Sequence, residues 1–220
     1  MTIDGPSGSG KGTVSRAVAA RAGWHWLDSG ALYRLTALAG ARSGLKSDDE
    51  AGHARAAAQM QVDFGTGPDA ERVTLDGRDV SVELRSEAAG SGASRVAAWP
   101  QVRQALLERQ KAFARPPGLV ADGRDMGTVV FPAARLKVYL TASAAARAER
   151  RYKQLKDKGS GVSLAALSRE IAERDHRDST RAVAPLKPAP DAHVIDSTDL
   201  TIEEVVERVL ALGRQRALWP

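Results

Sequence analysis

A glycine-rich stretch near the start of the chain constrains the fold more than any other feature. It reads Gly5-Pro6-Ser7-Gly8-Ser9-Gly10-Lys11-Gly12-Thr13 and lies between a short apolar run and a helical pattern. Gly5, Gly10 and Lys11 have the G-x-x-x-x-G-K spacing of a loop that binds phosphate. Glycines let backbone N–H groups turn toward phosphate oxygens, the next helix adds its positive N-terminal end, and the lysine adds a full charge. We therefore predict that residues 5–13 bind nucleotide phosphates and that Lys11 acts on the outer ones.

The residue after Lys11 departs from a common form of this loop. Many such loops carry a Ser or Thr there, whose hydroxyl holds Mg²⁺. This chain has Gly12 instead and places Thr13 one position later. We therefore expect Mg²⁺ to be held mainly by nucleotide phosphates and water, with Thr13 as a candidate ligand.

Short apolar runs alternate with longer amphipathic stretches along most of the chain. This alternation predicts an α/β fold, in which about five parallel strands are flanked by helices. The predicted strands are Thr2–Asp4, Trp24–Leu27, Leu119–Ala121, Leu136–Leu140 and Val194–Asp196. The predicted helices are Lys11–Arg21, Ala31–Ala41, Gln101–Ala114, Ala144–Lys156, Leu164–Arg174 and Ile202–Leu212.

Residues 45–95 break the alternation. A polar stretch precedes three β-like runs, Gln61–Phe64, Arg72–Leu75 and Asp79–Leu84, and Asp76-Gly77 is a turn signal between the last two. We predict a small antiparallel β/α insert here. A hairpin without a function is the alternative reading of the same pattern.

Arginines and carboxylates follow two of the predicted strands. Asp28-Ser29-Gly30 comes after the second strand with Arg34 about one helical turn later, and Asp122-Gly123-Arg124-Asp125 comes after Leu119–Ala121. Ligands of open parallel sheets bind outside the carboxyl ends of the strands. These groups are therefore expected near the phosphate loop, although an Arg beside an Asp can also be only a local salt bridge.

A basic segment covers residues 147–161. Arg147, Arg150 and Arg151 lie at i, i+3 and i+4 on one helical face, and Gly159-Ser160-Gly161 offers a hinge. The combination predicts a short lid that closes over a nucleotide and excludes water. A solvated helix face is the alternative.

Composition narrows the partners. The 220 residues carry a net charge of +5 and no cysteine, which excludes disulfides and thiol chemistry. Aromatic residues are only 5%, and the four tryptophans, at 24, 26, 99 and 219, lie away from the Arg clusters, which disfavours a nucleic-acid-binding ATPase. No N-K-x-D-like motif supports a GTPase. No run reaches the ~20 apolar residues of a membrane span, and no secretion signal is visible, so a cytoplasmic location is expected.

Several blocks resemble bacterial cytidylate kinase, a P-loop NTPase-like nucleoside monophosphate kinase. They occur in the order of that family and cover nearly the whole chain. The blocks are Gly10-Lys11-Gly12-Thr13, Leu27 to Arg34, Ser94-Arg95-Val96-Ala97 with Val102-Arg103, Asp122 to Thr128, and Glu173-Arg174-Asp175-x-x-Asp178-x-x-Arg181-x-x-x-Pro185-Leu186.

The resemblance implies a single kinase domain. Residues 1–44, 96–146 and 162–220 would form its core, 45–95 the insert that binds the nucleoside monophosphate, and 147–161 the lid. It implies ATP and CMP or dCMP as substrates, Mg²⁺ as cofactor, and a monomer that binds neither nucleic acid nor membrane.

The resemblance also implies roles for individual residues. Lys11, Arg124 and Arg150 would be catalytic. The acceptor phosphate would be held by Arg34, Arg124 and Arg181, the cytosine edge by Ser94, Arg103 and Asp125, and the ribose by Arg174 and Asp178, with Ser29 also in the CMP site. A kinase of UMP or of another small acceptor is the alternative within enzymes.

Overall fold

The computed structural model describes residues 1–65, 72–156 and 162–219, and the chain forms two compact units. The first unit consists of Met1–Asp28 and Lys111–Pro220, and the second of Ser29–Gln110. The predicted insert, residues 45–95, therefore lies inside a larger unit.

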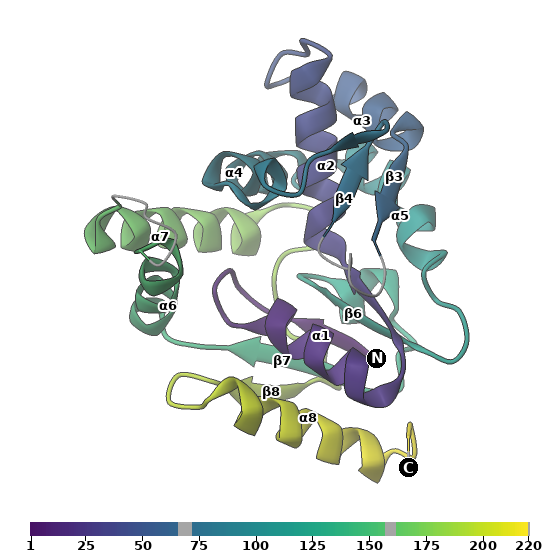
Figure 1. Ribbon diagram of the computed structural model, residues 1–220, viewed down its shortest axis with the longest axis vertical. Helices are drawn as coiled ribbons and strands as arrows, with labels where there is room; N and C mark the ends of the chain where they lie inside the picture. The colour runs from purple at the N-terminus through teal and green to yellow at the C-terminus, as the bar shows by residue number, and fades with distance from the viewer. Residues whose placement is uncertain (66–71, 157–161, 220) are drawn as a thin grey trace. The chain divides into compact units, whose positions relative to one another are not determined.

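A five-stranded parallel sheet is the framework of the first unit (Figure 1). Its strands are β1 (Thr2–Asp4), β2 (His25–Asp28), β6 (Leu119–Gly123), β7 (Lys137–Thr141) and β8 (His193–Asp196). They are arranged in the order β2-β6-β1-β7-β8, and every neighbouring pair is parallel. The phosphate loop follows the central strand β1. The predicted α/β fold with about five parallel strands is confirmed.

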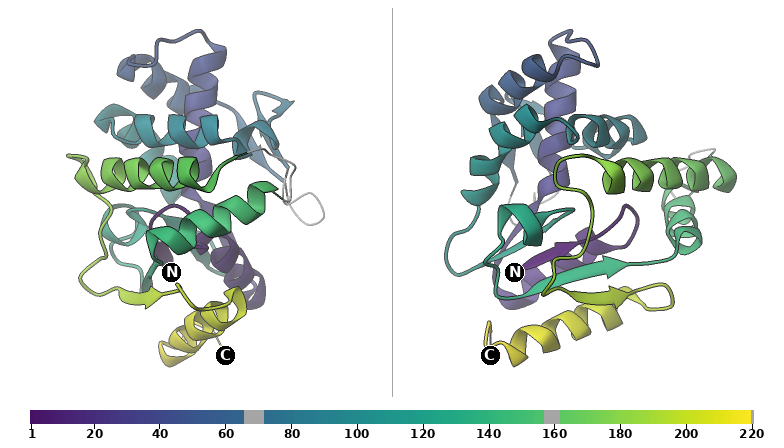
Figure 2. Two further views of the ribbon diagram at one scale, coloured as in Figure 1. Left: turned by 90° about the vertical axis from the view of Figure 1, so that its left-hand side faces the viewer. Right: turned by 180° about the vertical axis from the view of Figure 1, so that it is seen from behind.

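Helices and a π-helical turn accompany the sheet in the described part of the first unit. The helices are α1 (Lys11–Ala22), α6 (Ala144–Lys156), α7 (Leu164–Thr180) and α8 (Ile202–Gln215), and the turn is η3 (Met126–Val130). Helices α1 and α8 pack against each other, and α6 packs against α7 (Figure 2). The core lies between α1, α8 and the sheet, and includes Ile3, Val14, Val18, Val120, Val138, Leu140, Val206 and Val209. This packing fixes the start of α1 beside the end of β1.

The second unit combines helices with a small antiparallel sheet. Its helices are α2 (Ser29–Arg42), α3 (Glu50–Gln59), α4 (Glu87–Val96) and α5 (Pro100–Lys111), and its strands are β3 (Val62–Phe64), β4 (Val73–Leu75) and β5 (Arg78–Asp79). The strands pair in the order β3-β4-β5, antiparallel throughout. Asp76 and Gly77 have φ of 50° and 76°, the positive values that a tight turn between antiparallel strands requires.

The third β-like run of the insert does not form the predicted strand. Strand β5 ends at Asp79, and Glu83–Arg85 form a 3₁₀ turn, η2. Asp79 Oδ1 accepts hydrogen bonds from the Ser81 backbone N–H at 2.9 Å and from its hydroxyl at 2.6 Å. This local side-chain-to-backbone bonding competes with strand pairing and turns the chain.

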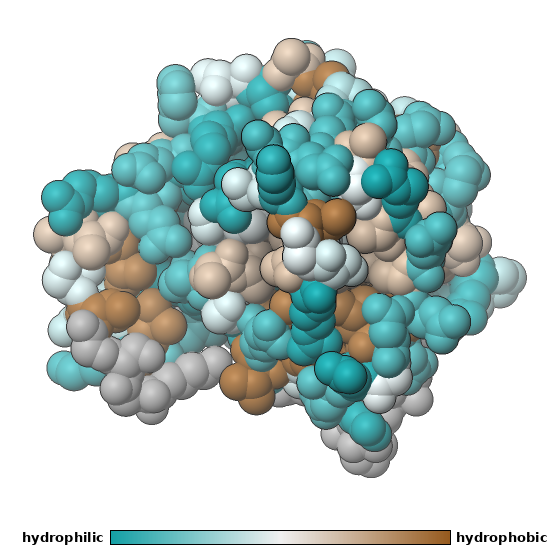
Figure 3. Space-filling model, turned by 90° about the horizontal axis from the view of Figure 1, so that it is seen from above, coloured by the Kyte–Doolittle hydropathy of each residue, from teal (hydrophilic) through white to brown (hydrophobic). Residues whose placement is uncertain are grey.

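The surface carries many polar side chains. Hydrophilic residues dominate the face drawn in Figure 3, with smaller apolar patches between them. Within the described ranges, no helix has the length and apolar character needed to span a membrane.

Candidate active site

The glycine-rich loop joins the end of β1 to the start of α1. The Gly5 N–H donates to Gly123 O on β6 at 3.3 Å. A Cβ at Gly5 would lie 2.0 Å from Leu140 O on β7, so no other residue fits without a backbone shift. Two neighbouring strands therefore fix the position at which the loop begins.

Lys11 is the first residue of α1 and is half-buried. Its Nζ donates to Pro6 O at 3.1 Å, so the side chain folds back over the loop. Burial and the charge of Arg124 lower the pKa of Lys11, while the carboxylates of Asp122 and Asp28 oppose the shift. An anionic phosphate in the loop would favour the charged form of Lys11, because its negative charge would offset the burial and the repulsion from Arg124.

Sequence reasoning missed the role of two carboxylates beside Lys11. Asp28 and Asp122 are register partners near the carboxyl ends of β2 and β6. Burial raises the pKa of Asp122, and the charge of Asp28 adds to the rise. Trp26 Nε1 donates to Asp122 Oδ2 at 2.8 Å, although the two residues are 96 positions apart in the sequence. The signal that could have found the pair is that both aspartates end strands of a parallel sheet.

This carboxylate pair bears on Mg²⁺. Mg²⁺ is usually bound through one or two carboxylates together with substrate phosphates and water. In the described ranges, no group of three His, Cys, Asp or Glu side chains could hold a metal ion. Asp28 and Asp122 therefore fit a magnesium ion that arrives with nucleotide phosphates. Thr13 is exposed near the start of α1.

Ion pairs join the segment after β6 to the end of α7. Arg124 Nε donates to Asp178 Oδ2 at 2.8 Å, and Arg181 Nη2 lies 3.8 Å from Asp125 Oδ1. Burial favours the neutral form of Asp178, yet Arg124 and the other nearby arginines hold its pKa below the usual range. Arg174 on α7 belongs to the same group of charges. Its guanidinium interacts electrostatically with Asp178 and with Lys11.

Arg147 does not lie on an exposed lid face. Its side chain is only 6% exposed and binds Asp175 through both terminal nitrogens, at 2.5 and 3.1 Å. It also donates to Ser7 O in the phosphate loop at 3.1 Å and to Ala142 O at 3.0 Å. Gly8, with φ of 78°, leaves room for this, because a Cβ there would lie 3.1 Å from the Arg147 Cβ. Arg147 thus ties α6 and α7 to the loop.

We expect Arg147→Ala to reduce the free energy of unfolding by about 2–3 kcal/mol, because it leaves Asp175 and two buried carbonyls without their donor. Urea unfolding measures the change. Arg151→Ala is the matched control: Arg151 is on the same helix and bonds to Gln154 one turn away, at 2.6 Å, and its loss should change stability by about 0.5 kcal/mol or less. Equal destabilisation by the two substitutions would contradict the anchoring role.

Arg150 contacts the loop between β8 and α8. It donates to Ser197 Oγ at 3.1 Å, to Ser197 O, and to Thr198 O at 3.2 Å. The single proton of the Ser197 hydroxyl is within reach of Thr141 O at 3.0 Å and of Ser9 O in the phosphate loop at 3.3 Å. Arg150 therefore binds a serine that lies beside the phosphate loop, and its catalytic role stays a prediction.

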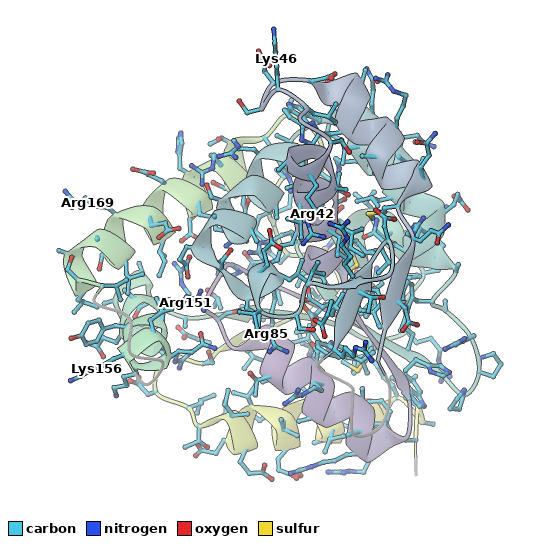
Figure 4. The ribbon with its side chains drawn as sticks, turned by 45° about the horizontal axis from the view of Figure 1, so that its top comes forward. Arg42, Lys46, Arg85, Arg151, Lys156 and Arg169 are labelled. Carbon is cyan, nitrogen blue, oxygen red and sulfur yellow. The ribbon has the colours of Figure 1, made fainter. Side chains whose placement is uncertain are left out.

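Other basic residues of α6 and α7 lie nearer the surface. Arg151 and Lys156 on α6 belong to the predicted lid, and Arg169 on α7 lies outside it; all three are labelled in Figure 4. Lys156 and Arg169 are exposed. The predicted hinge, Gly159-Ser160-Gly161, and the rest of 157–161 lie outside the described residues.

The second unit brings several of the predicted acceptor residues together. Arg103 is buried on α5, its guanidinium lies 5.8 Å from the centre of the Tyr33 ring, and its Nη1 donates to Ala97 O at 3.3 Å. Ser94 is buried on α4, one turn before Ala97. Arg34 is half-buried on α2, which packs against α4 and begins at the buried Ser29.

The glycine loop after a central parallel strand, with Lys11 and arginines around it, defines a P-loop phosphotransferase of the nucleoside monophosphate kinase class. The family model for cytidylate kinase matches residues 1–215. The chain belongs to the cytidylate kinase family.

Similar proteins span nearly the same length. The cytidylate kinase of Aeromonas salmonicida is 55% identical over 216 residues, which are 98% of this chain and 94% of that protein. The cytidylate kinase of Bordetella bronchiseptica is 58% identical over 97% of this chain and 94% of its own. That of Stutzerimonas stutzeri is 58% identical over 99% and 96%.

Proposed function

We propose that this protein transfers the terminal phosphoryl group of ATP to CMP or dCMP, giving ADP and CDP or dCDP. The observation that carries the proposal is the phosphate loop with Lys11 close enough to Arg124 for their charges to interact, in a chain of this family. The loop would hold the ATP phosphates, and Arg124 would face the acceptor.

Phosphoryl transfer needs alignment and charge neutralisation more than covalent chemistry by the protein. Lys11 and Arg124 would stabilise the negative charge of the moving group, and Arg150 would contribute from α6. The acceptor is already an anionic phosphate, so no general base is required. Mg²⁺, where bound, would neutralise ATP phosphate charge, and Asp28 and Asp122 would hold it through water.

The acceptor assignments follow the family resemblance and fit the observed chemistry. Arginine is suited to phosphate because its planar fork donates two parallel hydrogen bonds, which supports Arg34, Arg124 and Arg181 as phosphate ligands. A carboxylate can accept from the N4 amino group of cytosine, which supports Asp125 as a reader of the base. Ser94 and Arg103 would contact the same base, Arg174 and Asp178 the ribose, and Ser29 the CMP.

The proposal also covers the location and the oligomeric state of the protein. We infer that the protein acts in the cytoplasm, where both substrates occur, and that it acts as a monomer.

A coupled assay of ADP release tests the proposal. With ATP held constant, kcat/KM should be highest for CMP and dCMP, by about 100-fold or more over UMP, AMP and GMP. A reaction without acceptor should release little ADP. ADP release at the same rate with and without CMP would mean a simple NTPase, and a preference for UMP would mean a kinase of another acceptor.

A further inference from the structure

Asp4 is a buried carboxylate directly before the phosphate loop. It is the last residue of β1 and is 5% exposed. Its Oδ1 accepts from the Met126 N–H and its Oδ2 from the Gly127 N–H, each at 2.8 Å. A buried charge is costly unless it is hydrogen-bonded, so these two bonds are the reason that a carboxylate is tolerated there.

These bonds hold one end of the segment that carries Arg124 and Asp125. The other end is held next door, because Gly5 N–H donates to Gly123 O and Asp4 is the register partner of Gly123. The chain therefore leaves β6 at Gly123, carries Arg124 and the buried Asp125, and is held again at Met126. Both attachments come from Asp4 and Gly5.

Asp4 also caps the N–H groups at the start of η3, a role that Asp125 would otherwise fill. Asp125 is the N-cap residue of η3, and aspartate in that position commonly turns its carboxylate onto the N–H groups of the first turn. The Asp125 side chain makes no such cap bond, and the N–H groups of Met126 and Gly127 are already bound to Asp4. The Asp125 carboxylate is directed instead to Arg181, at 3.8 Å.

We propose that Asp4 is a positioning residue for base selection, which keeps the carboxylate of Asp125 turned toward the acceptor by capping η3 in its place. The proposal rests on the proposed function, because it assigns Asp125 to cytosine. Asp4 itself touches no substrate. Its effect is on the orientation of Asp125, and hence on the difference between CMP and UMP.

The protonation state of Asp4 offers a second way to test its role. Burial raises the pKa of Asp4 to about 6; the charge of Asp125 adds to the rise, while the two backbone N–H groups and Arg124 oppose it. Tyr139, its register partner on β7, is a further titratable group that interacts with it. A protonated Asp4 turns one acceptor oxygen into a donor, so one N–H of η3 becomes available to Asp125.

The pH dependence of stability linked to Asp4 shows that the fold does not need its negative charge. Since the folded pKa of Asp4 lies above the ordinary value near 4, the stability linked to its protonation is complete below pH 4 and is lost as pH rises through about 6. At neutral pH the ionised Asp4 carboxylate therefore lowers the free energy of unfolding relative to its neutral form. Asp4→Asn, which removes the charge, should leave the protein folded.

The test compares Asp4→Asn with Thr2→Val. Asparagine keeps the shape but can accept from only one of the two N–H groups. We expect kcat/KM for CMP to fall about tenfold or more, mainly through KM, with KM for ATP within about twofold and a smaller loss for UMP. Thr2 is the matched control: it lies on the same face of β1, is buried near Gly127, and its hydroxyl has no hydrogen-bond partner among the described residues. Thr2→Val should change none of these values.

A double-mutant cycle shows whether the effect passes through Asp125. In an Asp125→Asn background, adding Asp4→Asn should no longer alter the CMP/UMP ratio. An equal loss on CMP and UMP, or an undiminished effect in that background, would overturn the proposal. If the wild type itself did not prefer CMP, the proposed function would fail, whatever Asp4 does.

The wild-type protein provides an independent measurement. Both substrates carry the same phosphate, so its titration cancels in the ratio of their kcat/KM values. The CMP/UMP ratio should fall by about threefold or more between pH 7 and pH 5 as Asp4 takes up a proton. A constant ratio over this range would contradict the positioning role, even if Asp4→Asn did not fold.

Discussion

Replacing Lys11 with alanine is expected to lower kcat by about 100-fold or more, by analogy with the loss of one preorganised electrostatic group. Lys11 is the full charge of the phosphate loop, and α1 and the carbonyl of Pro6 hold it in place. Its pKa is lowered by burial and by Arg124, so the fold does not depend on its charge. Steady-state kinetics with CMP, together with a thermal melt, measure both effects.

Lys46→Ala is a suitable control for this experiment. Lys46 is an exposed lysine in the second unit, at the position labelled in Figure 4. Its replacement should leave kcat and the melt unchanged. A folded Lys11→Ala protein with near wild-type kcat would remove Lys11, and the loop with it, from the active site.

Asp125→Asn should narrow the CMP/UMP ratio, chiefly by weakening CMP. If Asp125 accepts from the cytosine amino group, UMP sets its O4 acceptor against a carboxylate, and a buried group is left unpaired. Discrimination in the wild type should then be about 100-fold or more in kcat/KM, at about 1.4 kcal/mol per tenfold. The amide keeps the shape and adds a donor, so the repulsion toward UMP is relieved. Measuring kcat/KM for both monophosphates in both proteins gives the ratio.

The structure gives a definite competing outcome. Asp125 lies 3.8 Å from Arg181, so it could serve only to orient that arginine. In that case Asp125→Asn would weaken CMP and UMP equally, through their shared phosphate. An unaltered ratio would therefore assign Asp125 to the phosphate rather than to the base.

The parallel core could be predicted because its signals are local. The glycine loop, the apolar runs and the helical patterns lie within short windows, and they gave the α/β fold with five parallel strands. Helices α3 and α4 were not predicted individually, because their buried faces consist mostly of Gly, Ala and Ser, which are also common in loops and turns. The strand order, with β6 between β2 and β1, depends on pairings about 90–120 residues apart that no local pattern contains.

The site shows the same division. Lys11 and the loop follow from spacing alone. The contact of Trp26 with Asp122 requires that β2 pair with β6 in one particular register. Arg147 lies at helical spacing with Arg150 and Arg151, yet it is buried, because Asp175 from another helix supplies a partner that the spacing cannot reveal.

The fit of Gly8 against α6 limits which residues position 8 can carry over evolutionary time. A Cβ at position 8 would lie 3.1 Å from the Arg147 Cβ and 3.4 Å from the Arg147 backbone oxygen, and the φ of 78° strains a side chain there as well. Any residue other than glycine at 147 carries the same Cβ, so replacing the arginine does not remove the crowding. Position 8 should therefore remain glycine whichever side chain occupies position 147.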